Sequence, residues 1–111
     1  VTELRGNSAF NIQTTKGGRQ LTVSAIILQW APDTRTSGYA SYDVYVYDDK
    51  MEPLFKDHVP DTVFADKSKT SCRIPVPGGP IIGTKELWIR LVPVHENGTA
   101  EVVFDVYALA S

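Results

Sequence analysis

The chain has 111 residues, of which 42% are hydrophobic and 22% charged, and its formal net charge is −2. This length fits one domain with its own hydrophobic core, and the composition lies far from that of disordered chains. The 11 basic residues are scattered among 13 acidic ones, so the basic face typical of nucleic-acid binding is missing. No apolar run approaches the roughly 20 residues of a membrane helix. We therefore expect no nucleic-acid partner and no membrane insertion.

The beginning of the chain is polar and without a regular pattern. We therefore expect a flexible N-terminal segment or linker over 1–8 and a single domain over 9–111. The chain starts without Met and without a signal peptide, which favours a mature product or a domain of a longer protein. From residue 10 to residue 14, apolar and polar residues alternate as in a strand. Gly17-Gly18 then predicts a tight turn, because glycine takes positive φ angles readily.

The strongest pattern of the first half ends at Trp30. Residues 21–30 predict a buried strand whose apolar positions change phase after Ala25, which indicates a bulge or burial on both faces. Pro32 ends this strand, because proline cannot donate to a β-ladder. We expect Trp30 at the centre of the core, together with Tyr42, Ile89 and Phe104.

Five more strands are predicted, over residues 42–47, 53–59, 70–76, 87–92 and 101–109. Residues 53–59 form the weakest pattern and fit a sheet edge, since Pro60 closes the segment. Residues 61–69 are mostly polar and predict a loop, although Val63 and Phe64 must pack somewhere. Seven short strands at about ten-residue spacing predict an all-β fold, namely a seven-stranded antiparallel two-sheet β-sandwich.

Three short motifs carry a family resemblance: Leu28-Gln29-Trp30-Ala31-Pro32, Tyr42-Asp43-Val44-Tyr45, and residues 87–94 followed by Glu96-Asn97-Gly98. They resemble the second, third and sixth strands of a fibronectin type III domain, which is an immunoglobulin-like sandwich. The family usually carries a corner tyrosine at the position of Leu87. This chain departs from the family there, since leucine cannot replace the hydrogen bond that the tyrosine hydroxyl makes. Other immunoglobulin-like sandwiches stay open as alternatives.

The resemblance implies that the third, sixth and seventh strands are neighbours in one sheet. Their outward positions would then gather one candidate binding face, made of Tyr45, Tyr47, Trp88, Arg90 and Tyr107, with Asp105 beside them. Exposed aromatic side chains next to charged ones can stack a sugar ring or anchor a protein partner. The alternative is cross-strand packing that only stabilises the sheet.

The remaining candidates fit structural roles better than chemical ones. Asn97-Gly98-Thr99 matches the glycan acceptor pattern, but it is also a favourable hairpin turn. Cys72 is the only cysteine and lies in an alternating run, which favours a small buried hydrophobe. Two further groups complete the set: the acidic residues Asp48, Asp49, Glu52, Asp57, Asp61 and Asp66, and the histidines His58 and His95.

The acidic residues match no calcium-loop spacing, so solvated charges that discourage strand pairing explain them better. Neither histidine lies in a pattern that places a nucleophile or further metal ligands beside it. We therefore expect no enzyme activity, no metal and no cofactor.

The resemblance implies a non-catalytic interaction or spacer module of a larger extracellular, cell-surface or virion-associated protein. Its partner would be another protein or a neighbouring domain of the same chain. The alternative is a carbohydrate-binding module, attached to a glycoside hydrolase, that uses the aromatic face. A small hydrolase is the third alternative, and no nucleophile and base at a suitable spacing support it.

Overall fold

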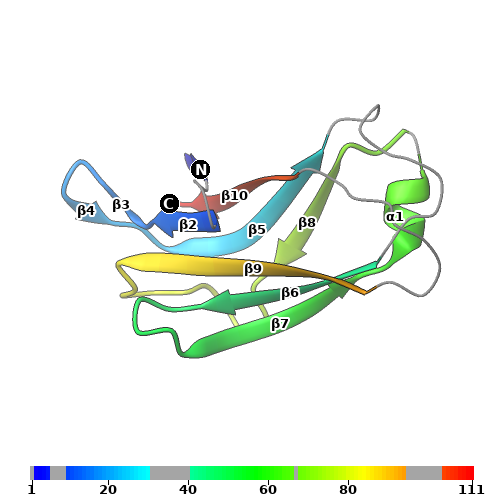
Figure 1. Ribbon diagram of the computed structural model, residues 1–111. Coiled ribbons are helices and arrows are strands. Elements are labelled where there is room, and N and C mark those ends of the chain that lie inside the picture. The colour runs from blue at the N-terminus through cyan, green and yellow to red at the C-terminus, as the bar shows by residue number, and fades with distance from the viewer. Residues whose placement is uncertain (1, 6–9, 31–40, 67, 95–103) are drawn as a thin grey trace.

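The computed structural model describes residues 2–5, 10–30, 41–66, 68–94 and 104–111. Strands dominate these residues, and Figure 1 labels the elements. They are β1 (Thr2–Arg5), β2 (Asn11–Gln13), β3 (Thr15–Lys16), β4 (Arg19–Gln20), β5 (Val23–Trp30), β6 (Ser41–Tyr47), β7 (Pro53–Val59), α1 (Asp61–Ala65), β8 (Ser71–Pro75), β9 (Glu86–Val94) and β10 (Phe104–Ala110).

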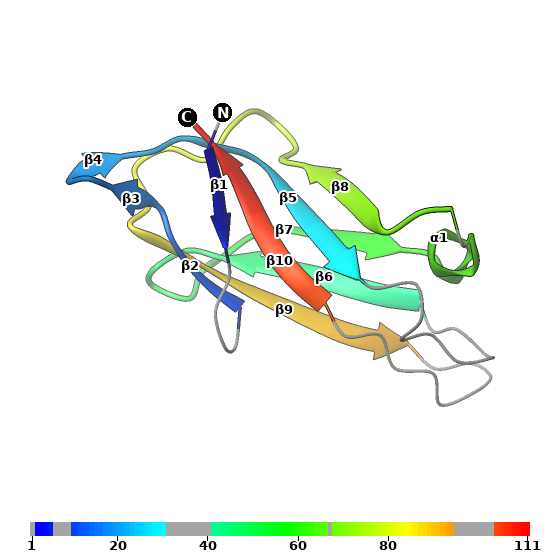
Figure 2. The same cartoon turned by 90° about the horizontal axis from the view of Figure 1, so that it is seen from above.

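Two four-stranded antiparallel sheets make up the body of the molecule. Sheet A has the strand order β1-β10-β5-β8, and sheet B has the order β2-β9-β6-β7. The two sheets lie face to face with the core between them (Figures 1 and 2), while the hairpin β3–β4 extends from one end. The predicted all-β antiparallel sandwich is therefore confirmed.

The structure has more strands than the sequence predicted. Each of the seven predicted segments contains a strand, and β1, β3 and β4 are additional. The prediction of a flexible segment over 1–8 is wrong for β1, because Thr2–Arg5 pairs with β10 in the register Thr2↔Ala110 to Arg5↔Tyr107. An edge strand is held by backbone hydrogen bonds to its neighbour, and these require no apolar alternation in the sequence.

The last strand lies in a different sheet from the one that the resemblance implied. β10 pairs with β1 and β5 in sheet A, and β2 takes the place beside β9 in sheet B. The third and sixth predicted strands, β6 and β9, are neighbours as expected. The expectation that the seventh strand joins them is wrong, because alternation predicts which face of a strand is apolar but not which sheet the strand enters.

A bulge accounts for the phase change in β5. Leu109 pairs with Ala25 and Ala110 pairs with Val23, so Ser24 is the extra residue. As a result Val23, Ile26, Leu28 and Trp30 all lie on the buried face. The sequence predicted a bulge or burial on both faces. The register shift agrees with the first, and the adjacent residues Ala25 and Ile26, both 0% exposed, agree with the second.

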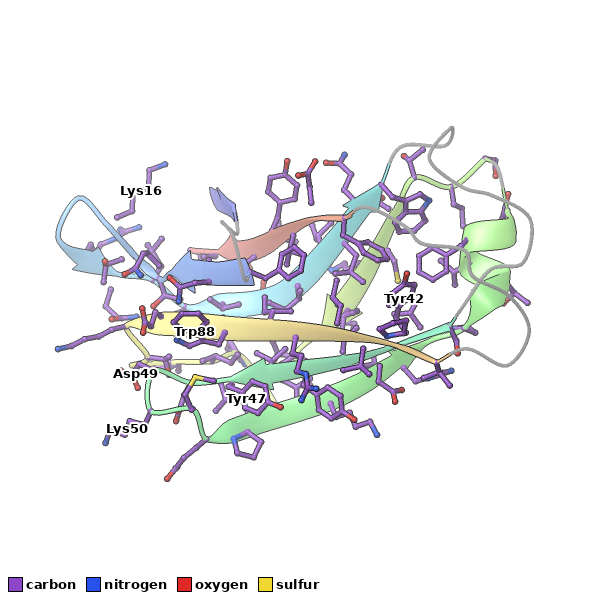
Figure 3. The ribbon with its side chains drawn as sticks, in the orientation of Figure 1. Lys16, Tyr42, Tyr47, Asp49, Lys50 and Trp88 are labelled. Atoms are coloured by element: carbon purple, nitrogen blue, oxygen red, sulfur yellow. The ribbon has the colours of Figure 1, made fainter. Side chains whose placement is uncertain are left out.

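An aromatic cluster fills one end of the core. The rings of Trp30 and Phe64 lie 4.9 Å apart between centroids, and those of Tyr42 and Phe104 lie 5.0 Å apart, all with edge-to-face geometry. Phe64 belongs to α1 and is 0% exposed, so the prediction of a loop over 61–69 is wrong there. The short helix places Phe64 against the core, 5.5 Å from the Tyr42 ring between centroids, and Figure 3 shows Tyr42 near α1. Trp30 and Tyr42, 4% and 5% exposed, are in the core as predicted.

Candidate functional site

The outer face of sheet B carries most of the predicted aromatic face. Tyr45 pairs with Arg90 and Tyr47 pairs with Trp88 across β6 and β9. Their sequence neighbours Val44, Val46, Leu87 and Ile89 are buried, so the four paired side chains point away from the core. The three aromatic side chains are half-buried and Arg90 is exposed. We call Tyr45, Tyr47, Trp88 and Arg90 the aromatic strip.

Tyr107 does not belong to the aromatic strip. It lies in β10 opposite Ile27 of β5, and its neighbours Val106 and Ala108 are buried against the core. Tyr107 and Asp105 therefore lie on the outer face of sheet A, on the opposite side of the sandwich. The predicted five-residue face is wrong at this position, because β10 enters sheet A.

The two tyrosines of the aromatic strip have near-parallel rings. Their ring centroids lie 6.5 Å apart and the ring planes differ by 16°. The Lys56 ammonium, on the neighbouring strand β7, lies 5.2 Å from the centroid of the Tyr45 ring, within range of a cation–π interaction. Lys56 also lies 3.9 Å from Asp43 Oδ2. The tyrosine rings are thus held by packing and by a neighbouring cation.

Glu86 holds the polar edge of Trp88. The indole Nε1 donates to Glu86 Oε1 at 3.1 Å, while Glu86 Oε2 accepts from Gln13 Nε2 at 3.0 Å and from Asn11 Nδ2 at 3.3 Å. These hydrogen bonds to the charged form, from Gln13 first and then Trp88 and Asn11, lower the pKa of Glu86 below that of an ordinary carboxyl group. The network orients Trp88 and leaves its ring face as its contact surface.

A groove of about 510 Å³ adjoins the aromatic strip. Its size is within the range of ligand-binding pockets in proteins, roughly 300 to 1,000 Å³. It is lined by Phe10, Tyr47, Met51, Trp88, Ile89, Arg90 and Leu91. Figure 3 shows Tyr47 and Trp88 on this side of the molecule, near the β6–β7 turn with Asp49 and Lys50.

Two residues that line the groove have unusual backbone conformations. Phe10 has φ +50° and Met51 has φ +62°, and among the described residues they are the non-glycine residues with positive φ. Such a conformation costs a side chain-bearing residue roughly 1 to 2 kcal/mol. At Met51 the turn is held by Asp48, whose Oδ1 accepts from the backbone N–H groups of Lys50 and Glu52, each at 2.9 Å. Strained residues that the surrounding structure fixes often gather at binding sites.

Sequence reasoning missed the groove. Its two strained residues belong to a segment before a three-residue strand and to a turn, and neither position shows a pattern that predicts contact with Trp88. The apolar Met51 within the polar run Asp48 to Glu52 is the one local feature that could have pointed to it.

The other candidate residues make local contacts. His58 Nδ1 lies 2.8 Å from Asp43 Oδ1 on the outer face of sheet B. Asp66 accepts hydrogen bonds from the backbone N–H and hydroxyl of Ser68, at 3.0 and 2.6 Å. In the described ranges, no three His, Cys, Asp or Glu side chains are grouped as metal ligands would be. Asn97 and His95 lie outside the described residues.

Cys72 is half-buried in β8. Burial is the main cause that raises the pKa of its thiol, and Asp57 adds to this while Lys69 opposes it. A raised pKa disfavours the thiolate, which is the reactive form of cysteine. The side chain therefore acts as a small packing residue, as the sequence predicted.

Comparisons of the chain with models of protein families, with curated protein sequences and with solved structures found no match. Among the residues described in the structure, no helix has the length and apolar character needed to cross a membrane.

Proposed function

We propose that the chain is a non-catalytic interaction module of a larger extracellular, cell-surface or virion-associated protein. It binds a protein partner through the aromatic strip and the adjoining groove. The observation that carries this proposal is the position of Trp88, whose indole donates to Glu86 and which lies beside Tyr47 and lines the groove. Oriented aromatic side chains beside an arginine are the residues that contribute most to protein interfaces.

The fold belongs, in this proposal, with the immunoglobulin-like sandwiches and is a variant of the fibronectin type III arrangement. The pairing of β6 with β7 and β9 supports this, since it keeps the third, fourth and sixth predicted strands of the resemblance in one sheet. The variant differs by the position of the last strand in sheet A, which leaves only three residues of β2 beside β9. Fold alone does not determine function, so the functional proposal rests on the site.

Charge supports a recognition role for the aromatic strip. Arg90 is exposed and has no ion pair among the residues that the structure describes, whereas Lys56 lies near Asp43. An unpaired guanidinium next to aromatic rings offers directional hydrogen bonds to a carboxylate of a partner. The strip thus combines apolar contact area with one charged group that is available to a partner.

Carbohydrate binding is the second candidate function. The half-buried, near-parallel rings of Tyr45 and Tyr47 favour it, because an aromatic ring on an outer sheet face can stack against the apolar face of a sugar ring. In this alternative the chain is a carbohydrate-binding module attached to a glycoside hydrolase.

Two arrays, probed in parallel with the labelled chain, test the proposed function. One carries secreted and cell-surface protein ectodomains, and the other carries glycans. We expect binding on the protein array that is lost with Trp88→Ala and with Arg90→Gln. Tyr107→Ala is the matched control, because this aromatic residue lies on the opposite sheet. Binding that survives both strip variants contradicts the proposal, and binding on the glycan array alone supports the second candidate.

A further inference from the structure

The β3–β4 hairpin carries two like charges next to its turn. Lys16 and Arg19 pair directly across the hairpin, so their side chains lie on the same face of this small sheet. Both residues are exposed, and neither has an ion pair in the part of the chain that the structure describes. Like charges in directly opposite positions repel each other, so this pair destabilises the hairpin.

The hairpin adds almost nothing to the core that could offset this repulsion. All residues of its two strands are exposed, and it extends from one end of the sandwich (Figure 2). A two-stranded hairpin is at best marginally stable in water on its own. This one is held at its base by Gln20, whose Nε2 donates to Thr84 O at 2.5 Å and to Thr14 Oγ1 at 3.2 Å. The base fixes the position of the hairpin, and the charges lie beyond it.

The turn of the hairpin is open to a partner. Gly17 and Gly18 have φ +61° and +77°, as a tight hairpin turn requires. A Cβ atom at either glycine would meet no other atom within 4 Å. Another molecule can therefore approach the bare backbone of the turn closely, beside the two cationic side chains.

A third cation lies beside the base of the hairpin. Thr14 N donates to Lys85 O at 3.0 Å, and the Lys85 side chain is exposed. Within the described ranges Lys85 has no ion pair, and the carboxylate of its neighbour Glu86 accepts the hydrogen bond of Trp88 instead. We call residues 15–20 together with Lys85 the cationic arm. The arm concentrates positive charge in a chain whose net charge is −2.

Shape and charge indicate what the cationic arm binds. A cleft surrounds a projecting hairpin on several sides, whereas a flat surface contacts only its tip. The groove of a second copy is a poor receptor, because it is lined by Arg90, which has the same sign as the arm. Asp49 and Glu52 lie in the β6–β7 turn at the same end of the molecule, where Figure 3 shows Asp49. Their charges repel a long polyanion that extends past the arm, which favours a compact group of carboxylates.

We propose that the cationic arm inserts into an acidic cleft of a second protein. Carboxylates of the cleft accept hydrogen bonds from Lys16, Arg19 and Lys85, and the bare turn at Gly17-Gly18 lies against the cleft wall. The negative charge of the cleft offsets the repulsion between the two cations of the free hairpin. Complementary charges of this kind guide the encounter and select the partner. This site goes beyond the proposed function, because it contains no residue of the aromatic strip.

A variant that combines Lys16→Gln with Arg19→Gln tests the arm on the array of protein ectodomains. We expect an array protein that binds the wild-type chain and Trp88→Ala equally. The double variant should bind it about tenfold more weakly, since charged hydrogen bonds are lost at a site where solvent screens them. Lys69→Gln combined with Arg73→Gln is the matched control, because it removes the same charge from exposed residues outside the hairpin and should leave the affinity unchanged. Oligo-glutamate should displace the array protein, and oligo-lysine should not.

Lys16→Glu tests the repulsion itself. It replaces a like-charge pair by an opposite-charge pair, so amide hydrogen exchange of Gly18 and Arg19 should slow by about twofold to fivefold. The same variant should lose the array protein. Exchange that is unchanged or faster overturns the inference, because the charge pair then has no cost that a partner must offset.

The outcomes separate this inference from the proposed function. Binding that depends on Trp88 and on neither Lys16 nor Arg19 overturns the role of the arm and leaves the proposed function intact. Equal weakening by the double variant and by the Lys69→Gln and Arg73→Gln control also overturns the inference, because net charge then explains the effect. So does dependence on the arm that is seen only for sulfated glycans on the glycan array, or a dimer of the chain that the double variant abolishes, since the occupant is then not an acidic cleft of a second protein.

Discussion

Two groups of aromatic residues lie on the two sides of sheet B, one in the core between the sheets and the other on the outer face. The core cluster contains Trp30, Tyr42, Phe64 and Phe104, and the aromatic strip contains Tyr45, Tyr47 and Trp88. Strand β6 contributes to both, because Tyr42 points inward and the other two tyrosines point outward. Residues of the same type thus pack in the core on one face and lie on the outer surface on the other, and the alternation of a strand separates the two groups.

The two tryptophans show the same difference in their polar atoms. Trp30 Nε1 is buried and has no hydrogen-bond partner among the described residues, whereas Trp88 Nε1 donates to Glu86. The contribution of Trp30 to stability therefore comes from packing of its ring alone, and the missing hydrogen bond reduces this contribution. The Trp88 hydrogen bond fixes the orientation of a ring that the core does not hold.

The largest expected effect comes from Trp30→Ala. It removes a side chain that is 4% exposed and leaves a cavity beside Phe64 and Phe104, so the free energy of unfolding should fall by about 3 to 5 kcal/mol. Urea denaturation measures the change. Trp88→Ala is the control and should cost less than about 1 kcal/mol, because its loss leaves no cavity in the core. Similar costs for the two variants contradict the division of roles between the tryptophans.

Phe64→Ala should have the next largest effect, at least about 3 kcal/mol. Phe64 is 0% exposed and contacts three rings of the core cluster. Its cost should lie at the lower end of the range for such substitutions, since α1 is a five-residue helix that can shift into the space. Leu54→Ala, at a residue that is 40% exposed, is the control. A cost for Phe64→Ala near that of the control contradicts the position of α1 over the end of the sandwich.

The sequence predicted the core better than the outer face of sheet B. Alternation placed Trp30, Tyr42 and Ile89 in the core, because the apolar face of a strand follows from its residues alone. The contribution of Phe64 was left undefined, since a single helical turn has no periodicity to detect. The seven predicted segments were all found as strands, yet the sheet that β10 joins depends on contacts between distant residues.

Four of the five residues of the predicted face lie together, because their strands are neighbours, and the fifth lies apart, because its position depends on the sheet topology. Tyr45, Tyr47, Trp88 and Arg90 come together because β6 pairs with β9. Tyr107 lies on the other sheet, and the groove beside Trp88 is lined by Phe10 and Met51, which have positive φ angles. Backbone conformations of this kind are set by the surrounding structure and have no signature in the residue types.

Met51→Gly tests whether the groove stores backbone strain. Met51 has φ +62° and is 55% exposed, so glycine should relieve strain at little loss of packing. We expect the free energy of unfolding to rise by up to about 1 kcal/mol. Binding on the protein array should fall, since the side chain lines the groove. Met51→Ala is the control, because it removes the side chain and keeps the strain. A rise in the free energy of unfolding of both variants, or of neither, contradicts the prediction that the backbone is strained at Met51.

The smallest expected effect is on the pH dependence of stability through Glu86. Its pKa is lowered by hydrogen bonds from Gln13, Trp88 and Asn11, so folding favours the carboxylate. A carboxyl group whose pKa falls on folding stabilises the protein fully above its unfolded pKa of about 4.3, and this stabilisation disappears as the pH falls through the lower folded value. Glu86→Gln should therefore destabilise the chain at neutral pH and lose this effect in acid.

Urea denaturation of the wild-type chain and of Glu86→Gln, repeated between about pH 7 and about pH 3, measures this difference. Glu52→Gln, in the exposed β6–β7 turn, is the matched control. The free energies of unfolding of Glu86→Gln and of the wild type are compared at each pH. If their difference stays constant with pH, the hydrogen bonds to the Glu86 carboxylate do not stabilise the fold. If the difference shrinks in acid while the variant binds less on the protein array at neutral pH, the carboxylate acts through the ring that it orients. The same hydrogen bond then contributes little to the core and much to the outer face, as the contrast between Trp30 and Trp88 requires.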